Sequence, residues 1–227
     1  MRRIGHADTR LHHNILRTEF AKQLPDGAGD AEQLLKVDQG TAQPTDWSND
    51  GRYVLFMKTD PVTKRDLWLM TMDSEHKTAA LLHTGFDEAE GKFSPEPSGA
   101  PHYVAYVSNE SGKEEVYVTT FPDPKLGKWP ISNAGGYQPR WRQDGKQLLY
   151  VTDDGKLMSV DVVLSPSFKA SPPKLLFQAP IFGGGSTIQQ YRWDLTPDGQ
   201  RFLVNTTSTD SSSPIAVVIN WQSALKR

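Results

Sequence analysis

The stretch Arg140-Trp141-Arg142-Gln143-Asp144-Gly145-Lys146-Gln147-Leu148-Leu149-Tyr150 decides the fold of this chain. It reads as the end of an apolar strand, an Asp-Gly turn and a second strand, which is the pattern of a tight β-hairpin. Two further copies occur, at residues 46–56 and 194–204, and a copy with a longer loop occurs at residues 92–106. The pattern is therefore an internal repeat.

The repeats are aligned by one apolar position in each copy, occupied by Trp47, Phe93, Trp141 and Leu195. Repeats of about 40 to 50 residues that hold several short strands are typical of β-propeller blades. We therefore predict an almost wholly β protein, a partial propeller ring of about four blades with four antiparallel strands each. The three aromatic residues are interpreted as core between blades, with ligand stacking as the alternative.

The repeat also divides the chain. We expect an N-terminal tail over residues 1–13 and a propeller segment over 14–227. Within it we predict a blade remnant at 14–37 and blades at about 44–83, 90–132, 138–178 and 189–221. The segment Ile15–Ala21 is ambiguous between helix and strand, and its place in the repeat favours strand.

The composition excludes several classes of function. The chain of 227 residues has a net charge of -2 and no cysteine, so no basic surface for nucleic acid, no disulfide and no thiolate metal site are expected. No apolar stretch follows Met1-Arg2-Arg3, so we predict neither an export signal nor a membrane span, and a cytoplasmic location for the sequence as given.

Three motifs that carry chemistry in other proteins are weak here. The run Gly183–Thr187 lacks the Lys of a phosphate-binding loop. The six histidines show no ligand spacing, and His6, His12 and His13 are expected in a solvated tail. No Gly-x-Ser-x-Gly elbow is present. We predict no catalytic residue, no metal, no cofactor, no ATP binding and no phosphoryl transfer.

Residues 87–90 read Asp-Glu-Ala-Glu. Two carboxyl groups can act as general acid and base, but a solvated charged face is the preferred interpretation. The remaining expectation rests on geometry, because the connections into each inner strand share one face of a propeller with those between second and third strands. Loops on a rigid scaffold often bind partners, and the candidate residues on this face are Phe86, Asp87, Glu88, Tyr137, Gln138, Gln190 and Tyr191.

Several phrases of the sequence resemble TolB-type, WD40-like propeller repeats: Phe93-Ser94-Pro95, residues 106–112 and Leu195-Thr196-Pro197-Asp198-Gly199. Residues 135–141, 198–206 and 214–221 resemble the C-terminal half of the propeller that follows the kinase domain in large bacterial serine/threonine protein kinases, notably acidobacterial ones. The resemblance spans roughly residues 14–227. Kinase activity is not implied, since the Gly-rich loop, the His-Arg-Asp and the Asp-Phe-Gly motifs are missing.

The resemblance implies a non-catalytic sensor or binding module with a protein or peptide partner, placed outside the cytoplasmic membrane if it belongs to such a kinase. The alternative is a hydrolase, or the accessory propeller of a prolyl-oligopeptidase-like hydrolase. An open ring would expose apolar blade faces. We therefore expect self-association as a two-fold dimer, the rival being a four-bladed monomer in which the Leu34 strand completes the last blade.

Overall fold

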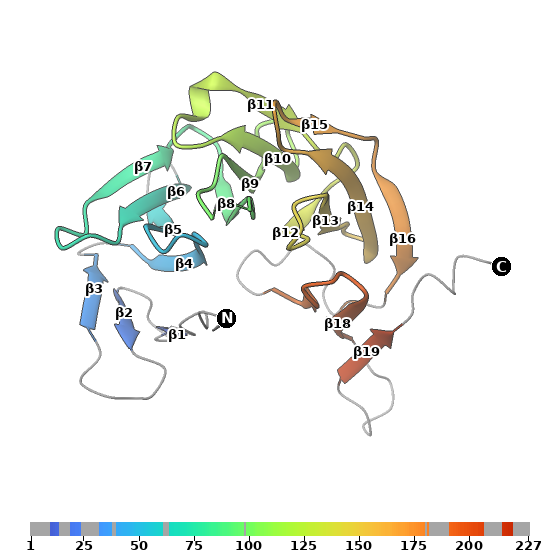
Figure 1. Cartoon of the computed structure of the whole chain (residues 1–227), viewed down its shortest axis with the longest axis horizontal. Helices are drawn as coiled ribbons and strands as arrows, with labels where there is room; N and C mark the ends of the chain where they lie inside the picture. The colour runs from blue at the N-terminus through green and yellow to red at the C-terminus, as the bar shows by residue number, and fades with distance from the viewer. Residues whose placement is uncertain are drawn as a thin grey trace, which may run out of the picture.

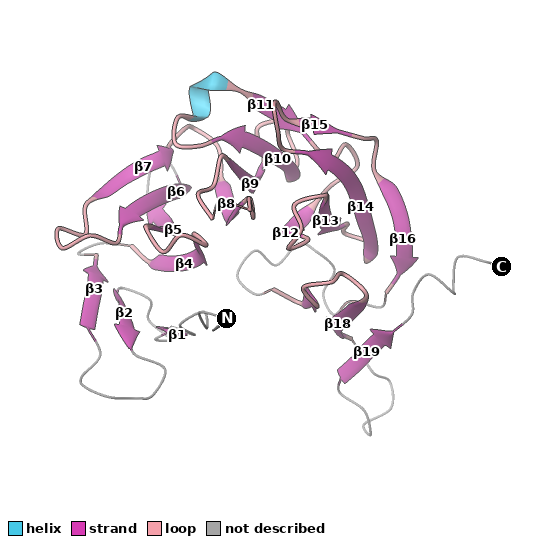
Figure 2. Ribbon diagram, in the orientation of Figure 1, coloured by secondary structure: helices cyan, strands magenta, loops and turns pink. Residues whose placement is uncertain are grey.

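The computed structural model covers residues 1–227 and describes 10–13, 19–23, 32–37, 40–60, 64–97, 99–179, 181, 191–206 and 215–219. Five antiparallel sheets follow one another along an arc, each built from consecutive segments of the chain (Figure 1). Colouring by secondary structure shows strands throughout and one short 3₁₀ turn, η1 at Pro124–Leu126 (Figure 2). The described residues are therefore all-β, as the repeat predicts.

The sheets correspond to an N-terminal remnant and four blades. The N-terminal sheet holds β1 (Arg10–His13), β2 (Glu19–Gln23) and β3 (Glu32–Lys36). Blade 1 holds β4 (Ala42–Trp47), β5 (Tyr53–Asp60), β6 (Lys64–Thr71) and β7 (Thr78–Leu82). Blade 2 holds β8 (Glu88–Phe93), β9 (Tyr103–Ser108), β10 (Glu115–Thr120) and β11 (Lys128–Pro130).

Blade 3 carries one strand more than a standard blade. Its strands are β12 (Tyr137–Trp141), β13 (Gln147–Val151), β14 (Lys156–Val163), β15 (Lys169–Ala170) and β16 (Lys174–Gln178). Both β15 and β16 pair with β14, at its two ends. Blade 4 holds β17 (Trp193–Leu195), β18 (Arg201–Asn205) and β19 (Ile215–Ile219).

Apolar side chains fill the space between neighbouring sheets. Between blades 1 and 2 the cluster includes Leu55, Leu67 and Tyr106, and between blades 2 and 3 it includes Val118 and Leu148, all at most 2% exposed. Because both faces of a central blade are covered, its strands are apolar along their whole length, and every residue of β9 is buried. This packing holds the inner strands β4, β8, β12 and β17 in fixed register around the centre.

The tight turns after the inner strands β4, β12 and β17 repeat one local structure. Gly51, Gly145 and Gly199 adopt positive φ angles of 74°, 69° and 68°, which glycine tolerates without steric cost. In blade 1 the Ser48 hydroxyl donates to Asp50 Oδ1 at 2.6 Å; Thr196 does the same to Asp198 in blade 4. These side-chain bonds fix the hairpin geometry that the Asp-Gly pattern predicts.

Inner strands β4, β8 and β12 each contain a β-bulge. The register shifts between Ala89 and Lys92 in β8 and between Tyr137 and Arg140 in β12. At the bulges Glu90 and Gln138, which are equivalent repeat positions, have φ angles of 57° and 54°. A non-glycine residue with positive φ is strained and persists only where its surroundings fix it. The bulges turn these two side chains into the buried centre.

Three expectations need correction. Arg10–His13 were expected in a tail, but they form β1 and pair with β2. The Leu34 strand does not complete the last blade: among the described strands β3 pairs with β2 alone, and Leu34 packs against blade 1 at Val54, Phe56 and Met70. The group at residues 87–90 is not a solvated face, because Glu88 is only 2% exposed and Glu90 only 3%.

The two ends of the arc stay separate in the described strands, so the dimer remains a prediction.

Within the described residues, no helix is long and apolar enough to cross a membrane.

Candidate functional site

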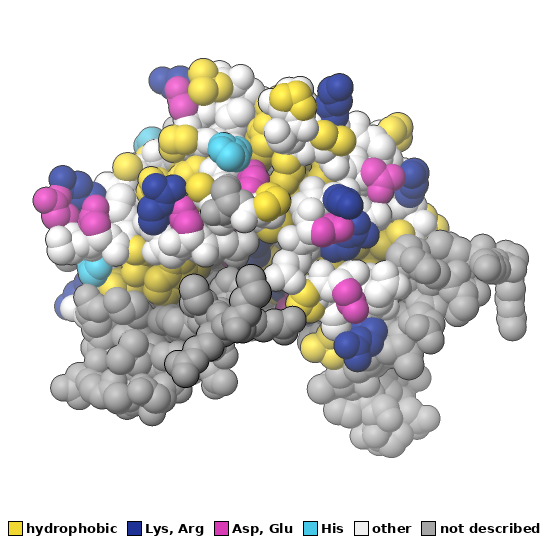
Figure 3. All heavy atoms as spheres, viewed as in Figure 1, with side chains coloured by type: hydrophobic (Ala, Val, Ile, Leu, Met, Phe, Trp, Pro, Cys, Tyr) yellow, Lys and Arg dark blue, Asp and Glu magenta, His cyan; other side chains and the backbone are white. Residues whose placement is uncertain are grey.

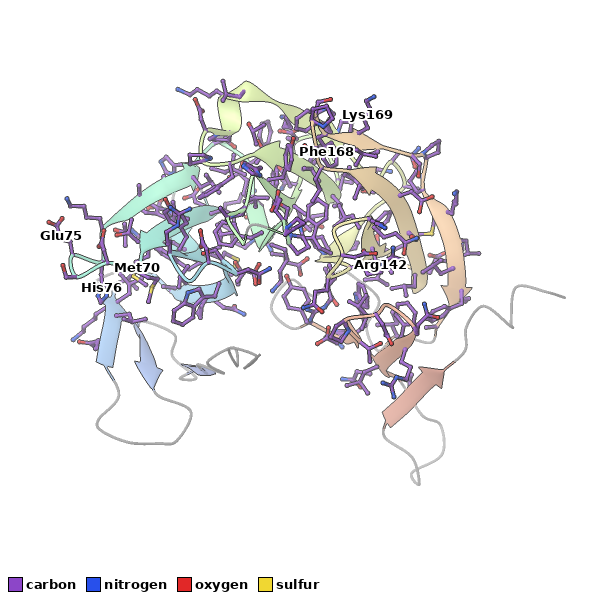
Figure 4. The ribbon with its side chains drawn as sticks, viewed as in Figure 1. Met70, Glu75, His76, Arg142, Phe168 and Lys169 are labelled. Atoms are coloured by element: carbon purple, nitrogen blue, oxygen red, sulfur yellow. The ribbon has the colours of Figure 1, made fainter. Side chains whose placement is uncertain are left out.

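Two surfaces of the arc carry candidate residues. The first, here called the loop face, carries the connections between second and third strands and those that enter the inner strands, at residues 84–87, 109–114, 133–136 and 152–155. The turn face lies at the other end of the strands and carries the tight turns at 48–52, 142–146 and 196–200, together with the longer connection between β8 and β9. Figure 4 places Arg142, at one of these turns, toward the middle of the arc, whereas Phe168 and Lys169 lie at its outer rim.

On the loop face, the predicted residue Asp87 is part of a network between blades. Its Oδ1 accepts hydrogen bonds from the backbone N–H of Arg65 at 3.2 Å and from Arg65 Nε at 2.9 Å. Arg65 Nη2 also donates to Glu114 Oε1 at 3.3 Å. Burial acts to raise the pKa of Asp87, but its bonds and charge contact with Arg65 hold that pKa below the usual value. Asp87 thus joins blade 1 to blade 2.

Tyr137, the second predicted aromatic anchor, is only 4% exposed. Its hydroxyl donates to Glu114 Oε2 at 3.4 Å, and burial together with Asp153 and Glu114 raises the pKa of the phenol. The ring packs in the core with Leu149 and Val151. Tyr137 therefore links blades 2 and 3 and offers little surface to a partner.

Glu88 and Gln138 are also buried. The Thr84 hydroxyl donates to Glu88 Oε1, and burial raises the pKa of the Glu88 carboxyl. The backbone N–H of Gln138 donates to Glu90 Oε2 at 2.5 Å, and Gln138 Oε1 accepts from the N–H of Arg192 at 2.9 Å. Of the predicted residues, Phe86 alone is a large exposed hydrophobic side chain, at 44%. Gln190 lies outside the described residues.

The centre of the arc holds the last predicted residue, Tyr191. Its hydroxyl donates to the backbone oxygen of Glu90 at 3.3 Å, which joins blade 4 to blade 2 across the centre. Lys92 Nζ lies 4.7 Å and the Arg140 guanidinium carbon 4.4 Å from the centre of its ring. A cation over an aromatic face is stabilised by the negative charge density of that face. The ring of Tyr191 therefore contacts two cationic side chains at the centre of the arc.

Toward the turn face these cations line a cleft of about 250 Å³. Every inner strand contributes to it, through the residue that precedes the aligned apolar position and through that position itself. The lining includes, in chain order, Asp46, Trp47, Lys92, Phe93, Arg140, Trp141, Asp194 and Leu195. Two acids and two bases therefore alternate with apolar side chains around one opening.

The charged groups of the cleft form two pairs. Lys92 Nζ lies 3.8 Å from Asp46 Oδ1 and donates to the backbone oxygen of Thr45. Arg140 Nη1 lies 3.4 Å from Asp194 Oδ1. Burial lowers the pKa of the Lys92 ammonium, and the nearby positive charge of Arg140 lowers it further. Elsewhere, on the face seen in Figure 3, most basic and acidic side chains also lie next to one another.

The side chains that line the cleft determine what it could bind. Among the described residues no group of three His, Cys, Asp or Glu side chains is arranged to hold a metal ion. Ser94, the serine at the cleft, is 2% exposed and donates to Glu96 Oε1 at 2.7 Å. Charged pairs flanked by indole rings instead suit a ligand that combines polar and apolar parts.

The sequence contained a signal for this site that the repeat alignment did not use. The position before each aligned apolar residue reads Asp46, Lys92, Arg140 and Asp194. Because equivalent positions of a propeller converge on its axis, charges at one such position must meet. The apolar position of the repeat predicts the fold, whereas the charged position beside it indicates the site.

The fold described above is a β-propeller built as an open arc. No protein-family model matches the sequence, and no curated protein matches it either.

Solved structures do match the fold. TolB from Acinetobacter baumannii has a TM-score of 0.63 at 15% identity, covering 93% of this chain and 50% of that one. The β-propeller domain of Cps50 (Swd1) from Myceliophthora thermophila has a TM-score of 0.55 at 15% identity, covering 96% of this chain and 72% of that one. A puromycin-hydrolyzing peptidase from Mycobacterium tuberculosis has a TM-score of 0.59 at 18% identity, covering 89% and 34%.

The fold is thus a TolB-like β-propeller, and this chain spans about half of the length of the TolB structure.

Proposed function

We propose that this chain is a non-catalytic ligand-binding module whose ligand lies in the central cleft of the turn face. The observation that carries the proposal is the convergence of four inner strands, each of which places one charged side chain at the same opening. The cleft is rigid, because its walls belong to strands whose other residues pack in the interblade core. A rigid, partly apolar cleft with a few placed charges is the usual form of a small-ligand site.

A ligand screen tests this proposal. We expect some members of a library of charged metabolites to raise the melting temperature of the protein, since a ligand that binds the folded state stabilises it. Arg140→Gln should abolish those shifts. Arg52→Gln is the control, because Arg52 is an exposed arginine in the turn between β4 and β5 and does not line the cleft. Stabilising ligands that act equally on both variants would contradict the proposal.

A second candidate is a protein or peptide partner on the loop face. The exposed side chain of Phe86 favours it, because an aromatic residue that stands out from a polar rim can anchor an interface. As a sensor module of a larger bacterial kinase, the chain would offer this face to a partner. Panning a peptide library on the protein, followed by competition with Phe86→Ala, tests this candidate, and an upstream kinase reading frame would support the parentage.

The hydrolase alternative is supported at the level of the fold, since one structural neighbour is a hydrolysing peptidase. Fold alone does not carry an activity. Turnover of a panel of generic esters and peptides by the isolated chain would favour this alternative, and its absence would favour the binding module.

A further inference from the structure

The Arg140–Asp194 pair is the part of the cleft best able to accept a ligand. Of the five N–H donors of Arg140, Nε is bonded to the backbone oxygen of Trp193 at 3.1 Å. Nη1 has the 3.4 Å contact with Asp194, and Nη2 forms no hydrogen bond with a described residue. The Arg140 side chain is 19% exposed. The edge formed by Nη1 and Nη2 can bind a carboxylate through two parallel hydrogen bonds once the 3.4 Å contact of Nη1 is displaced.

Asp194 is the complementary half of the pair. Its side chain is 58% exposed, and its Oδ1 accepts from the backbone N–H of Leu195 at 2.8 Å. The acid is therefore fixed in place while remaining open to solvent. An exposed ion pair at 3.4 Å is weak, so a ligand can replace it at little cost. The cleft thus presents an acceptor for a cation directly beside a donor edge for an anion.

The other pair is less available. Asp46 Oδ2 accepts from the backbone N–H of Phe93 at 2.8 Å. Lys92 is held by Thr45 and lies over the Tyr191 ring. These contacts join blades 1, 2 and 4, so removing either group would disturb the inner strands. Together the four charges sum to zero, which favours a ligand without net charge over a simple anion.

Resting on the proposed cleft function, we infer that the ligand is a free α-amino acid with an apolar side chain. Its carboxylate would bind the Nη edge of Arg140 and its ammonium group Asp194, since both charges of an α-amino acid sit on one carbon. Its side chain would lie against the apolar lining, which includes Trp47, Trp141 and Leu195. The volume of about 250 Å³ is small for a drug-sized ligand, and suits a single residue better than a peptide.

Calorimetric titration with L-leucine, leucine amide and N-acetyl-L-leucine tests the inference on the full chain. We expect saturable binding of L-leucine and at least tenfold weaker binding of the other two, because the amide lacks the carboxylate and the acetyl compound lacks the ammonium group. Arg140→Gln and Asp194→Asn should each weaken L-leucine binding at least tenfold, while Arg52→Gln should not change it. Asp194→Asn alters an exposed side chain, so it keeps the test valid if Arg140→Gln does not fold.

Each other outcome overturns the inference in a distinct way. Equal binding of N-acetyl-L-leucine would show a plain carboxylate site. No binding of L-leucine, together with library ligands that are lost in Arg140→Gln, would remove the amino acid but keep the cleft function. If no ligand of any kind depended on the cleft, both the amino acid inference and the proposed cleft function would be contradicted.

Discussion

The two faces of the arc use similar polar residues for opposite purposes. On the loop face, Arg65, Asp87 and Glu114 direct their side chains at one another, and every contact crosses a blade boundary. On the turn face, Arg140 keeps its Nη edge open beside an exposed Asp194. The same ion-pair chemistry therefore holds blades together at one end and leaves a site at the other.

The difference teaches how to separate structural polar groups from functional ones. A charged side chain whose hydrogen bonds are all made within the protein contributes to stability and has little left for a ligand. A charged side chain that is positioned but only partly bonded has donors to spare. By this criterion Asp87 is a structural residue, whereas Arg140 and Asp194 of the cleft remain available to a ligand. The following predictions test that division.

The largest expected effect lies between the two faces, at Glu90. Burial raises the pKa of its carboxyl group to about 8, against 4.5 for a free side chain, and its charged neighbours are Arg65, Lys92 and Glu114. The folded state therefore holds the proton more tightly than the unfolded state does. The stabilisation is complete below pH 4.5 and is lost as the pH rises to about 8.

We expect the unfolding free energy of the natural protein to fall between pH 5 and pH 9 by more than that of Glu90→Gln, with roughly 5 kcal/mol as the upper limit. Glutamine occupies the equivalent position 138 in blade 3, so the substitution fits a bulge of this kind. Urea unfolding at both pH values measures the difference. Parallel pH profiles for the two proteins would show that Glu90 is ionised in the folded state.

Removal of Arg65 should have the next largest effect. Arg65→Met removes the cation shared by Asp87 and Glu114, which are 13% and 24% exposed, and leaves Asp87 only the 3.9 Å contact with the exposed Lys64. Because the pairs are mostly buried, we expect a loss of about 2–3 kcal/mol in unfolding free energy. L-leucine binding should be unchanged. The exposed Arg52 offers the control, since Arg52→Met should not change stability measurably.

Tyr137→Phe should lower the free energy of unfolding by less. It deletes a hydroxyl that donates to Glu114 and keeps the buried ring, so we expect a loss of about 1 kcal/mol. Chemical unfolding at pH 7 measures it. If the variant instead lost binding to a selected peptide while retaining its stability, Tyr137 would belong to a binding surface after all.

The smallest change in stability is expected for Phe86→Ala, within about 0.5 kcal/mol, because the ring is 44% exposed. The variant is informative because it separates ligands of the loop face from ligands of the cleft. Loss of a selected peptide in this variant, with cleft ligands retained, would assign the peptide to the loop face. Retention of every ligand would leave the loop face as structure alone.

The repeat was enough to predict the fold. The Asp-Gly turns and the interval of about 48 residues follow from local chemistry, and together they indicate the all-β repeat that the strands show. The strands outside the repeats were harder to predict. The strand Arg10–His13 has no counterpart in the repeat, and its pairing with β2 depends on tertiary context rather than on its own sequence.

The burial of Glu90 beside the site was less predictable, because it depends on a backbone geometry that carries no residue signature. The bulges at Glu90 and Gln138 have positive φ angles without glycine, and they shift the register of the inner strands. That shift buries Glu90, which the sequence alone suggested was solvated. Position on the axis, rather than residue type, decides which polar side chains meet.

Blade 2 is tied at its inner strand to a neighbour on either side. The backbone N–H of Phe93 donates to Asp46 of blade 1, and Trp141 Nε1 of blade 3 donates to the backbone oxygen of Lys92 at 3.1 Å. In an array whose units contact mainly their neighbours, each unit opens at a cost set by the bonds it shares. The middle of the arc should therefore open last, and its amide protons should exchange with solvent most slowly. Opening would then proceed inward from both ends, and the cleft would lose Asp194 while the Lys92 side was still folded.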